Sequence, residues 1–282
     1  MKNGLVLPPH SLRKLIQRSL EEDVGPGDVT TAAVLRVGQT GRAVALAKAG
    51  IVVAGIDVFR EIFLAVDPEI VVTVCRDNGE EAGNGDILAE ISGRLASILM
   101  AERVALNFLQ RMCGIATATS KYVAEVKGTK ARILDTRKTA PGLRLLDKLA
   151  VRTGGGGNHR FGLFDGILVK DNHIAAAGGI ASAVALIREG VSHMLKVEVE
   201  VNSIEGVEEA LRAGADIVML DNMSVSEMKK AVSLVGGRIP LEASGNITLT
   251  TVREVAETGV DFISVGALTH SVIAADISLK VE

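Results

Sequence analysis

Aromatic side chains are scarce in this sequence. Only 2% of the 282 residues are Phe, Trp or Tyr, and tryptophan is absent. Proteins that bind single-stranded nucleic acid stack bases on aromatic rings, and most nucleic-acid-binding domains are basic. This chain has a formal net charge of −3. We therefore expect no nucleic-acid partner.

Long apolar runs and cysteines are also few. The sequence contains no run of about 18 apolar residues, the length needed to span a membrane. Its start, MKNGLVLPPH, lacks the apolar segment of a signal peptide. Cys75 and Cys113 are the two cysteines, too few for a disulfide framework and compatible with a reducing compartment. These features predict a cytoplasmic protein with no membrane partner. Hydrophobic residues make up 48% of the chain, enough for a sizeable core.

The first 126 residues mix helix and strand patterns without regular alternation, which predicts an α+β fold. Strand patterns occupy 42–54, 70–75 and 87–91. Helical patterns occupy 11–20, 56–65 and a longer segment after Ser97. Ser97 is a candidate N-cap for that last helix, and Gly114 is expected to end it before a second helix reaches residue 126.

From residue 131 the chain alternates strands with helices. The predicted strands are 132–134, 166–169, 195–201, 217–220, 240–243 and 262–265. The predicted helices are 143–151, 181–189, 204–213, 225–235 and 249–258. This alternation is typical of right-handed βαβ units and a parallel sheet. We predict an incomplete α/β barrel, with an open doubly wound sheet as the alternative.

Polar side chains follow nearly every predicted strand. They are Asp135-Thr136-Arg137, Lys170-Asp171-Asn172, Glu198 with Glu200, Asp221-Asn222, Ser244-Gly245-Asn246, and Gly266. Ligands bind at the carboxyl ends of strands in both architectures. Glycines after the last strands also let backbone N–H groups approach a phosphate. The strand ends therefore predict one site.

The segment KVEVEV (196–201) places charges inside the predicted sheet. Alternation puts its valines on one face and Lys196, Glu198 and Glu200 on the other. We expect the valines to meet the helices and the charges to face the barrel interior, where buried carboxylates need cationic partners. Lys196 and nearby basic residues could supply them. The alternative is an edge strand with one solvated face.

Residues 136–173 are locally cationic, with seven Lys or Arg against three acids. A basic segment in an acidic protein favours binding of a small anion. The four-glycine loop 154–157 lacks the spacing of a dinucleotide fingerprint, so we expect close backbone approach there, with His159 and Arg160 binding an anion at its exit. Histidines and cysteines show no metal-ligand spacing. Carboxylates at strand ends instead suit Mg²⁺ shared with substrate phosphates.

Together these segments resemble the quinolinate phosphoribosyltransferase family over nearly the whole chain. The matching motifs are EDVGPGDVTT (22–31), AERVALNFLQRMCGIAT (101–117), DTRKTAPGLR (135–144), GGGGNHRFGLFDGILVKDNH (154–173), VEVEV (197–201), LDN (220–222), ASGNI (243–247) and SVGALTHS (264–271). Thr153 and Asn246 depart from residues frequent in the family, cysteine and glycine respectively. Neither is a charged site position.

The resemblance implies two domains. An N-terminal α+β sandwich would comprise 1–114 completed by the tail 270–282, and an open parallel α/β barrel of six or seven strands would comprise 115–269. Such enzymes are homodimers or higher homo-oligomers with shared active sites. They join quinolinate to 5-phosphoribosyl 1-pyrophosphate with Mg²⁺, giving nicotinate mononucleotide, pyrophosphate and CO₂ in NAD synthesis.

The resemblance also implies residue roles. Quinolinate would be held by Arg103 of a partner subunit and by Arg137, His159, Arg160 and Lys170. Lys138 and Mg²⁺ would neutralise pyrophosphate, while Glu200 and Asp221 would bind ribose and serve as candidate metal ligands. The 5-phosphate would lie on Ser244, Gly245, Asn246 and Gly266. Lys138, Lys170, Glu200 and Asp221 would form the catalytic set. Arg144, Lys148 and Arg152 receive no role, and the first two are expected to be helix surface charges.

Two other functions fit parts of the pattern. A Schiff-base lyase would use Lys170 or Lys196 as its amine, but it leaves the Arg and His cluster without a role. A paralogue with the same fold could bind another anion. The full set of charged positions argues against that second interpretation.

Overall fold

The computed structural model describes residues 9–282 and divides into two compact units, which are described separately. Lys121–Thr139 and Gly156–His270 form the second unit, and the other described residues form the first. The prediction about a signal peptide concerns a segment that lies largely outside the described residues. Within 9–282, no helix combines the length and the apolar character needed to cross a membrane.

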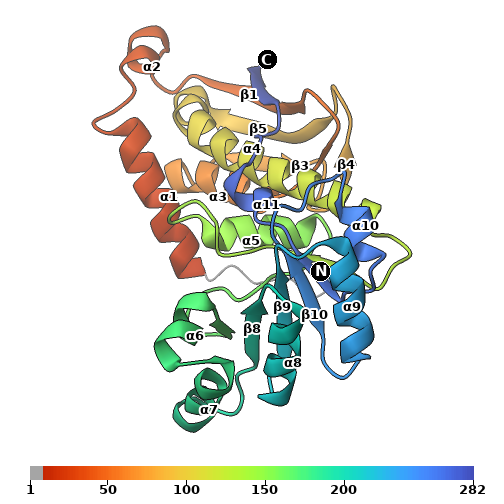
Figure 1. Cartoon of the computed structure of the whole chain (residues 1–282). Helices are drawn as coiled ribbons and strands as arrows, with labels where there is room; N and C mark the ends of the chain where they lie inside the picture. Colours follow the sequence, from red (N-terminus) through yellow and green to blue (C-terminus); the bar gives the residue numbers. More distant parts are fainter. Residues whose placement is uncertain (1–8) are drawn as a thin grey trace. The chain divides into compact units, whose positions relative to one another are not determined.

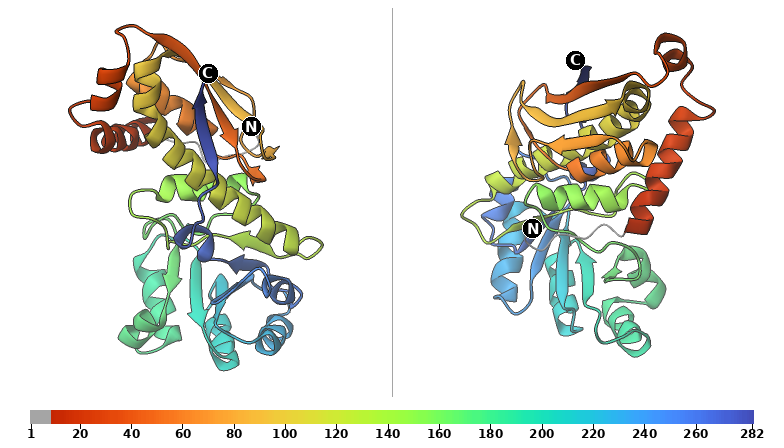
Figure 2. Two further views of the ribbon diagram at one scale, coloured as in Figure 1. Left: turned by 90° about the horizontal axis from the view of Figure 1, so that it is seen from above. Right: turned by 180° about the vertical axis from the view of Figure 1, so that it is seen from behind.

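An antiparallel sheet forms the centre of the first unit. Its strand order is β12 (Ile277–Val281), β1 (Thr40–Ala47), β5 (Ile87–Arg94) and β3 (Val71–Val74). Figure 2 shows β12 lying along β1, so the end of the chain belongs to this sheet. A second pair, β2 (Ile51–Val52) and β4 (Glu81–Ala82), is separate. The prediction of one strand over 42–54 was therefore wrong, because the chain turns between β1 and β2.

The helices assigned to the first unit include one that is longer than predicted. They are α1 (Pro9–Val24), α2 (Val29–Val34), α3 (Ile56–Val66), most of α4 (Leu95–Glu125) and α5 (Arg144–Thr153). The predicted cap at Ser97 and break at Gly114 were both wrong, because α4 begins at Leu95 and continues through Gly114. A Cβ at Gly114 would overlap the backbone carbonyl of Ile273. The glycine thus admits a neighbouring chain segment instead of ending the helix.

Helix α5 carries buried charges. Asp147 is fully buried, and Arg111 of α4 donates to its two carboxylate oxygens from Nε and Nη2 at 2.8 Å each. Lys148 is buried as well, so its prediction as a surface charge was wrong. Arg144 is half-buried and Arg152 is exposed. A bidentate ion pair of this kind holds α5 to α4 within the first unit.

The second unit contains a six-stranded parallel sheet. Its order is β6 (Arg132–Leu134), β11 (Phe262–Ser264), β10 (Leu241–Ser244), β9 (Ile217–Asp221), β8 (Val197–Val201) and β7 (Ile167–Val169). Strands that follow one another in the chain are neighbours throughout, except β6 and β7. A doubly wound sheet would reverse direction in the middle, so that alternative was wrong. The predicted open α/β barrel is confirmed (Figure 1).

The four-glycine loop lies beside the open edge at β6. Gly157 forms an isolated parallel bridge with Leu134, and its N–H donates to the carbonyl of Ile133 at 2.7 Å. A Cβ at Gly157 would lie 2.6 Å from Leu134 Cδ2. The predicted close backbone approach is therefore present at this residue, and it sets the path of the chain into His159.

Helices follow the strands of the second unit, in the order α6 (Asp171–Ala177), α7 (Ile180–Gly190), α8 (Ile204–Arg212), α9 (Val225–Val235), α10 (Val252–Ala256) and α11 (Ala267–His270). The sequence pattern missed α6 and α11, which are short. Helices α7 to α10 contact one another in chain order, as the outer layer of a barrel does.

Strand β8 has two different faces. Its valines are buried, with Val197 and Val199 fully so, and Glu198 on the other face is only 6% exposed. Strand β8 pairs with β7 along one edge and with β9 along the other, so the alternative that it is an edge strand was wrong. Lys196 precedes β8 and is exposed. It lies at the opposite end of the strand from Glu200, so the prediction that it partners these carboxylates was also wrong.

Candidate active site

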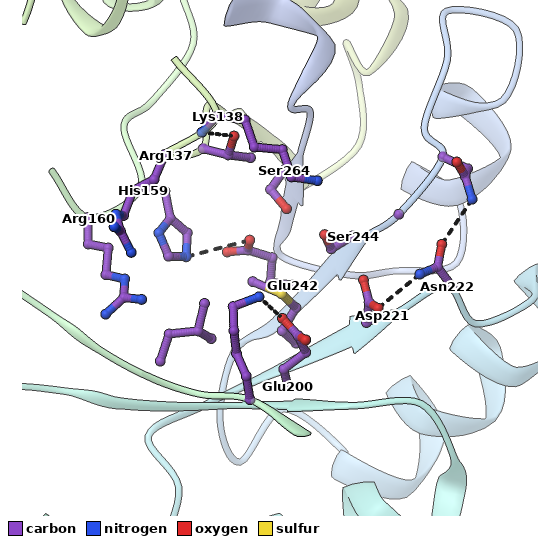
Figure 3. A pocket seen from close by; sticks show the side chains of 16 residues that line it. Arg137, Lys138, His159, Arg160, Glu200, Asp221, Asn222, Glu242, Ser244 and Ser264 are labelled. Atoms are coloured by element: carbon purple, nitrogen blue, oxygen red, sulfur yellow. Dashed lines mark hydrogen bonds and ion pairs between the residues drawn. The ribbon is translucent and has the colours of Figure 1, made fainter. Parts of the chain in front are cut away.

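A cavity of about 580 Å³ lies in the second unit, at the carboxyl ends of the barrel strands. Figure 3 shows cations on one side of it, with Glu200, Asp221 and Asn222 facing them. Its lining residues are Thr136, Arg137, Lys138, His159, Arg160, Leu168, Lys170, Glu200, Met219, Asp221, Asn222, Glu242, Ser244, Gly245, Asn246 and Ser264. The arrangement is bipolar, with anion-binding groups opposite carboxylates.

A buried carboxylate holds the segment that carries His159. Asp135 follows β6 and is fully buried. It accepts hydrogen bonds from Asn158 Nδ2 at 2.6 Å and from the backbone N–H of His159 at 2.9 Å. Next to it, Thr136 Oγ1 accepts from the backbone N–H of Lys138 at 3.0 Å. Asp135 thus fixes the loop after the glycines against the end of β6.

Two guanidinium groups lie close together on the cationic side. Arg160 donates from Nη1 to the carbonyl of Gly166 at 2.9 Å, which orients its side chain. Burial, together with the neighbouring charge of Arg137, lowers the pKa of Arg160. Adjacent cations that are partly removed from water favour an anionic ligand between them. A carboxylate is the ligand that a guanidinium binds in bidentate geometry.

Lys170 is paired with an acid of the neighbouring strand. Its Nζ lies 2.6 Å from Glu200 Oε2, and its backbone N–H donates to His173 Nδ1 at 3.0 Å. A Schiff-base lysine must have its amine free to attack a carbonyl carbon, whereas Lys170 Nζ is engaged by Glu200. Lys196 is remote from the cavity. The geometry therefore gives no support to a Schiff-base lyase.

A chain of amide contacts links two strand ends on the acidic side. Asn222 Nδ2 donates to Asp221 Oδ2 at 2.9 Å, and Asn246 Nδ2 donates to Asn222 Oδ1 at 3.0 Å. Asn222 and Asn246 have φ values of 54° and 52°, and Gly245, which directly precedes Asn246, has a φ of 98°. Left-handed backbone suits Asn and Gly. These turns place side-chain and backbone groups of 244–246 at the cavity wall.

Gly245 is expected to be essential for this turn. A Cβ there would overlap Asn222 Oδ1, so Gly245→Ala should strain this turn and lower the free energy of unfolding by about 1–3 kcal/mol. Gly85→Ala is the matched control, because Gly85 has a φ of 90° and a Cβ added to it would meet nothing within 4 Å. Urea unfolding of both variants checks this. An equal loss of stability in the two variants would contradict it.

Two predicted site residues do not line the cavity. Gly266 is adjacent to it, since a Cβ on Gly266 would lie 3.2 Å from Lys138 Cδ. Arg103 is exposed on α4, in the first unit. The other predicted site residues, namely Arg137, Lys138, His159, Arg160, Lys170, Glu200, Asp221, Ser244, Gly245 and Asn246, are brought together around the cavity.

Glu242 was not predicted as a site residue. It lies on β10, is 2% exposed, and reaches the cavity floor, where Figure 3 shows the ring of His159 facing it. Burial, and then the neighbouring Glu198, raise the pKa of Glu242 to about 8. The sequence did contain a signal, because Glu242 lies between the apolar residues Leu241 and Ala243 of the strand LEAS, and strands of a parallel sheet covered on both faces are normally apolar.

Two sets of side chains could bind a metal ion. His159, Glu198 and Glu242 have ligand atoms within 4.8 Å of one another, but Mg²⁺ prefers an all-oxygen shell that retains several waters. The carboxylates of Glu200 and Asp221, which also line the cavity, suit Mg²⁺ better because they offer only oxygen ligands. A metal shared with a phosphate-bearing ligand fits there.

The raised pKa of Glu242 predicts a pH-dependent stability. Between pH 4.5 and about 8 the folded chain holds a proton at Glu242 that the unfolded chain releases, so the free energy of unfolding should fall as pH rises through this window, by up to about 1.4 kcal/mol per pH unit. Glu242→Gln should flatten the fall. Urea unfolding at pH 5.5 and 8 checks this, with exposed Glu90→Gln as control. Equal pH slopes in wild type and Glu242→Gln would contradict it.

A parallel barrel that presents guanidinium groups, lysines and glycine turns opposite carboxylates defines an α/β-barrel enzyme for small, phosphate-bearing anions. Family models match the chain and identify one family within this class of enzymes. The model "Quinolinate phosphoribosyl transferase, N-terminal domain" matches residues 28–113, and "Quinolinate phosphoribosyl transferase, C-terminal domain" matches residues 115–280. The chain belongs to the quinolinate phosphoribosyltransferase family.

Individual relatives match this chain over most of their own length. The chain is 43% identical to a probable nicotinate-nucleotide pyrophosphorylase [carboxylating] of Bacillus subtilis, covering 96% of this chain and 93% of the relative. It is 46% identical to a chloroplastic nicotinate-nucleotide pyrophosphorylase [carboxylating] of Arabidopsis thaliana, covering 98% and 84%. The solved nicotinate-nucleotide pyrophosphorylase of Francisella tularensis matches with a TM-score of 0.95 at 42% identity, covering 98% of each chain.

Proposed function

We propose that this enzyme transfers the 5-phosphoribosyl group of 5-phosphoribosyl 1-pyrophosphate to quinolinate and releases pyrophosphate and CO₂, giving nicotinate mononucleotide for NAD synthesis. One observation carries the proposal. A single cavity joins the paired guanidinium groups of Arg137 and Arg160 to the carboxylates of Glu200 and Asp221. A dicarboxylate and a sugar centre that becomes cationic need these two environments side by side.

The cationic side suits quinolinate. Its two carboxylates would lie on Arg137, Arg160 and Lys170, with His159 completing the contacts. Guanidinium groups fix a planar carboxylate in one orientation. This directs the ring nitrogen toward the acidic side of the cavity, where the sugar would be placed.

The acidic side suits the ribosyl donor. Glu200 and Asp221 would accept hydrogen bonds from the ribose hydroxyls and stabilise positive charge at the anomeric carbon. Lys138 would neutralise the pyrophosphate, and the turn 244–246, together with Gly266, would receive the 5-phosphate. Mg²⁺ would be held mainly by the substrate, with Glu200 and Asp221 as its protein ligands, and would neutralise charge on the leaving group.

The bond changes then balance without a covalent enzyme intermediate. The ring nitrogen forms a bond to the anomeric carbon, while the carbon–oxygen bond to pyrophosphate breaks. The nitrogen becomes quaternary, so the adjacent ring carbon can accept the electron pair of its bond to the carboxylate as CO₂ leaves. A proton from solvent then replaces CO₂ on that carbon.

We further propose a homodimer in the cytoplasm, in which Arg103 of the partner subunit completes the quinolinate site. Arg103 is exposed on α4, as such a contact requires. Cys75 and Cys113 are free thiols, which agrees with a reducing compartment.

A direct assay tests the substrate pair. Purified protein with Mg²⁺, quinolinate and the ribosyl donor should form a mononucleotide that chromatography separates from both substrates. Nicotinate in place of quinolinate should give at least about 100-fold less product, because it lacks the second carboxylate for the paired cations. Equal use of nicotinate would overturn the proposed substrate.

A further inference from the structure

Three side chains meet beside the cavity, and two of them have no part in the proposed reaction. His159 and Glu242 line the cavity, whereas Glu198 lies behind them. His159 enters from the loop after the glycines, Glu198 from β8 and Glu242 from β10. His159 Nε2 lies 2.9 Å from Glu198 Oε2 and 3.8 Å from Glu242 Oε1. The two carboxylates come from strands on either side of β9 and both face the interior.

The arrangement of these two carboxylates favours a proton on one of them. Both glutamates are almost fully buried, and neither Glu198 Oε1 nor Glu242 Oε1 has a hydrogen-bond partner within residues 9–282. In register on β9 and β11, Glu242 has Met219 and Phe262 as neighbours, and neither is charged. Two ionised carboxylates facing each other in such a place would repel and be poorly solvated. A proton on Glu242 removes that cost, and its raised pKa agrees.

A proton on Glu242 determines which group donates and which group accepts each hydrogen bond. With the proton on Glu242, that carboxyl group donates toward Glu198, and Glu198 accepts the N–H of His159 Nε2. The backbone of His159 is already held by Asp135, so Glu198 is the group that fixes the rotation of the ring. A carboxylate behind a histidine sets both its orientation and the nitrogen that carries hydrogen.

We propose that Glu198 and Glu242 are positioning residues that act through His159 and thereby set the affinity for quinolinate. The identity of the substrate rests on the proposed function, whereas the arrangement of the three side chains does not depend on it. Neither glutamate is required to touch the substrate. Glu242 holds Glu198 in place by a hydrogen bond, and Glu198 in turn fixes which edge of the His159 ring faces the cavity.

Substitutions of Glu242 separate hydrogen bonding from charge. Glu242→Gln keeps a neutral donor of the same shape, so quinolinate KM should stay within about threefold of wild type. Glu242→Leu removes the donor, so quinolinate KM should rise roughly 10- to 100-fold. In both variants kcat and donor KM should change less than about threefold, because the proposed function places His159 against quinolinate and not against the donor. Equal KM values for Gln and Leu, or a matching loss in kcat and both KM values, would overturn the proposal.

Nitrogen-15 NMR of histidine-labelled protein tests the positioning without substrate. The His159 signal, identified by its absence in His159→Asn, should show a protonated Nε2 in wild type and Glu242→Gln. Glu198→Leu should lose that signature. A wild-type ring with hydrogen only on Nδ1 would overturn the proposal, as would stoichiometric zinc or manganese bound by wild type and lost in Glu242→Gln. If no mononucleotide forms while the predicted NMR signature is present, the substrate assignment fails and the positioning stands.

Discussion

Arg160→Met is expected to raise the KM for quinolinate by at least about 100-fold and to leave the KM for the ribosyl donor within a few-fold of wild type. Truncating one member of a desolvated, hydrogen-bonded charge pair costs about 2–5 kcal/mol. Arg160 is partly buried beside Arg137 and is oriented by the carbonyl of Gly166, so water cannot easily replace it. Steady-state kinetics with each substrate varied in turn give both constants.

Arg212→Met is the control for this substitution. Arg212 lies on α8, with a side chain 73% exposed and a long contact to Glu208, so its loss should leave both KM values unchanged. Arg160→Lys is a second comparison, since it keeps the charge but not the bidentate geometry. An Arg160→Met enzyme with wild-type quinolinate KM would show that this guanidinium does not bind the acid.

Mixing two inactive variants should restore activity if Arg103 serves a partner's site. Arg103→Ala and Lys138→Ala should each lower kcat/KM by at least about 100-fold as homodimers. In a random heterodimer, one of the two sites receives both wild-type residues. With half of the dimers mixed, the recovered activity should be about a quarter of wild type.

Heterodimers carrying two different affinity tags make this result decisive. Material purified on both tags should have about half the wild-type activity per dimer. A mixture of Lys138→Ala with Arg137→Ala is the control, because both residues belong to the same cavity of one chain, and no complete site can then form. Inactive Arg103→Ala/Lys138→Ala heterodimers would refute a shared site.

Most of the cavity could be predicted from the sequence, because ligands of such folds bind at the carboxyl ends of the parallel strands. That position depends on topology alone. Once β6 to β11 form one parallel sheet, every residue that follows a strand lies at the same edge, as Asp135, Lys170 and Asp221 illustrate. The alternation of VEVEV also predicted correctly which face of β8 is buried against helices. These inferences require only strand polarity and a period of two.

The sequence missed features that depend on contacts between distant segments. Gly114 reads as a helix break, and only the carbonyl of Ile273 beside it explains a glycine inside α4. Lys148 reads as a surface charge, although the packing of α5 buries it. Glu242 is one acid in a short strand, and its significance appears only when Glu198 and His159 are placed next to it.

Quinolinate labelled with carbon-14 in its 2-carboxylate shows whether phosphoribosyl transfer and decarboxylation are coupled. We expect equal amounts of labelled CO₂, pyrophosphate and unlabelled nicotinate mononucleotide, with no labelled CO₂ when the ribosyl donor is omitted. A mononucleotide that retains the label, or labelled CO₂ released without the donor, would contradict coupled phosphoribosyl transfer and decarboxylation.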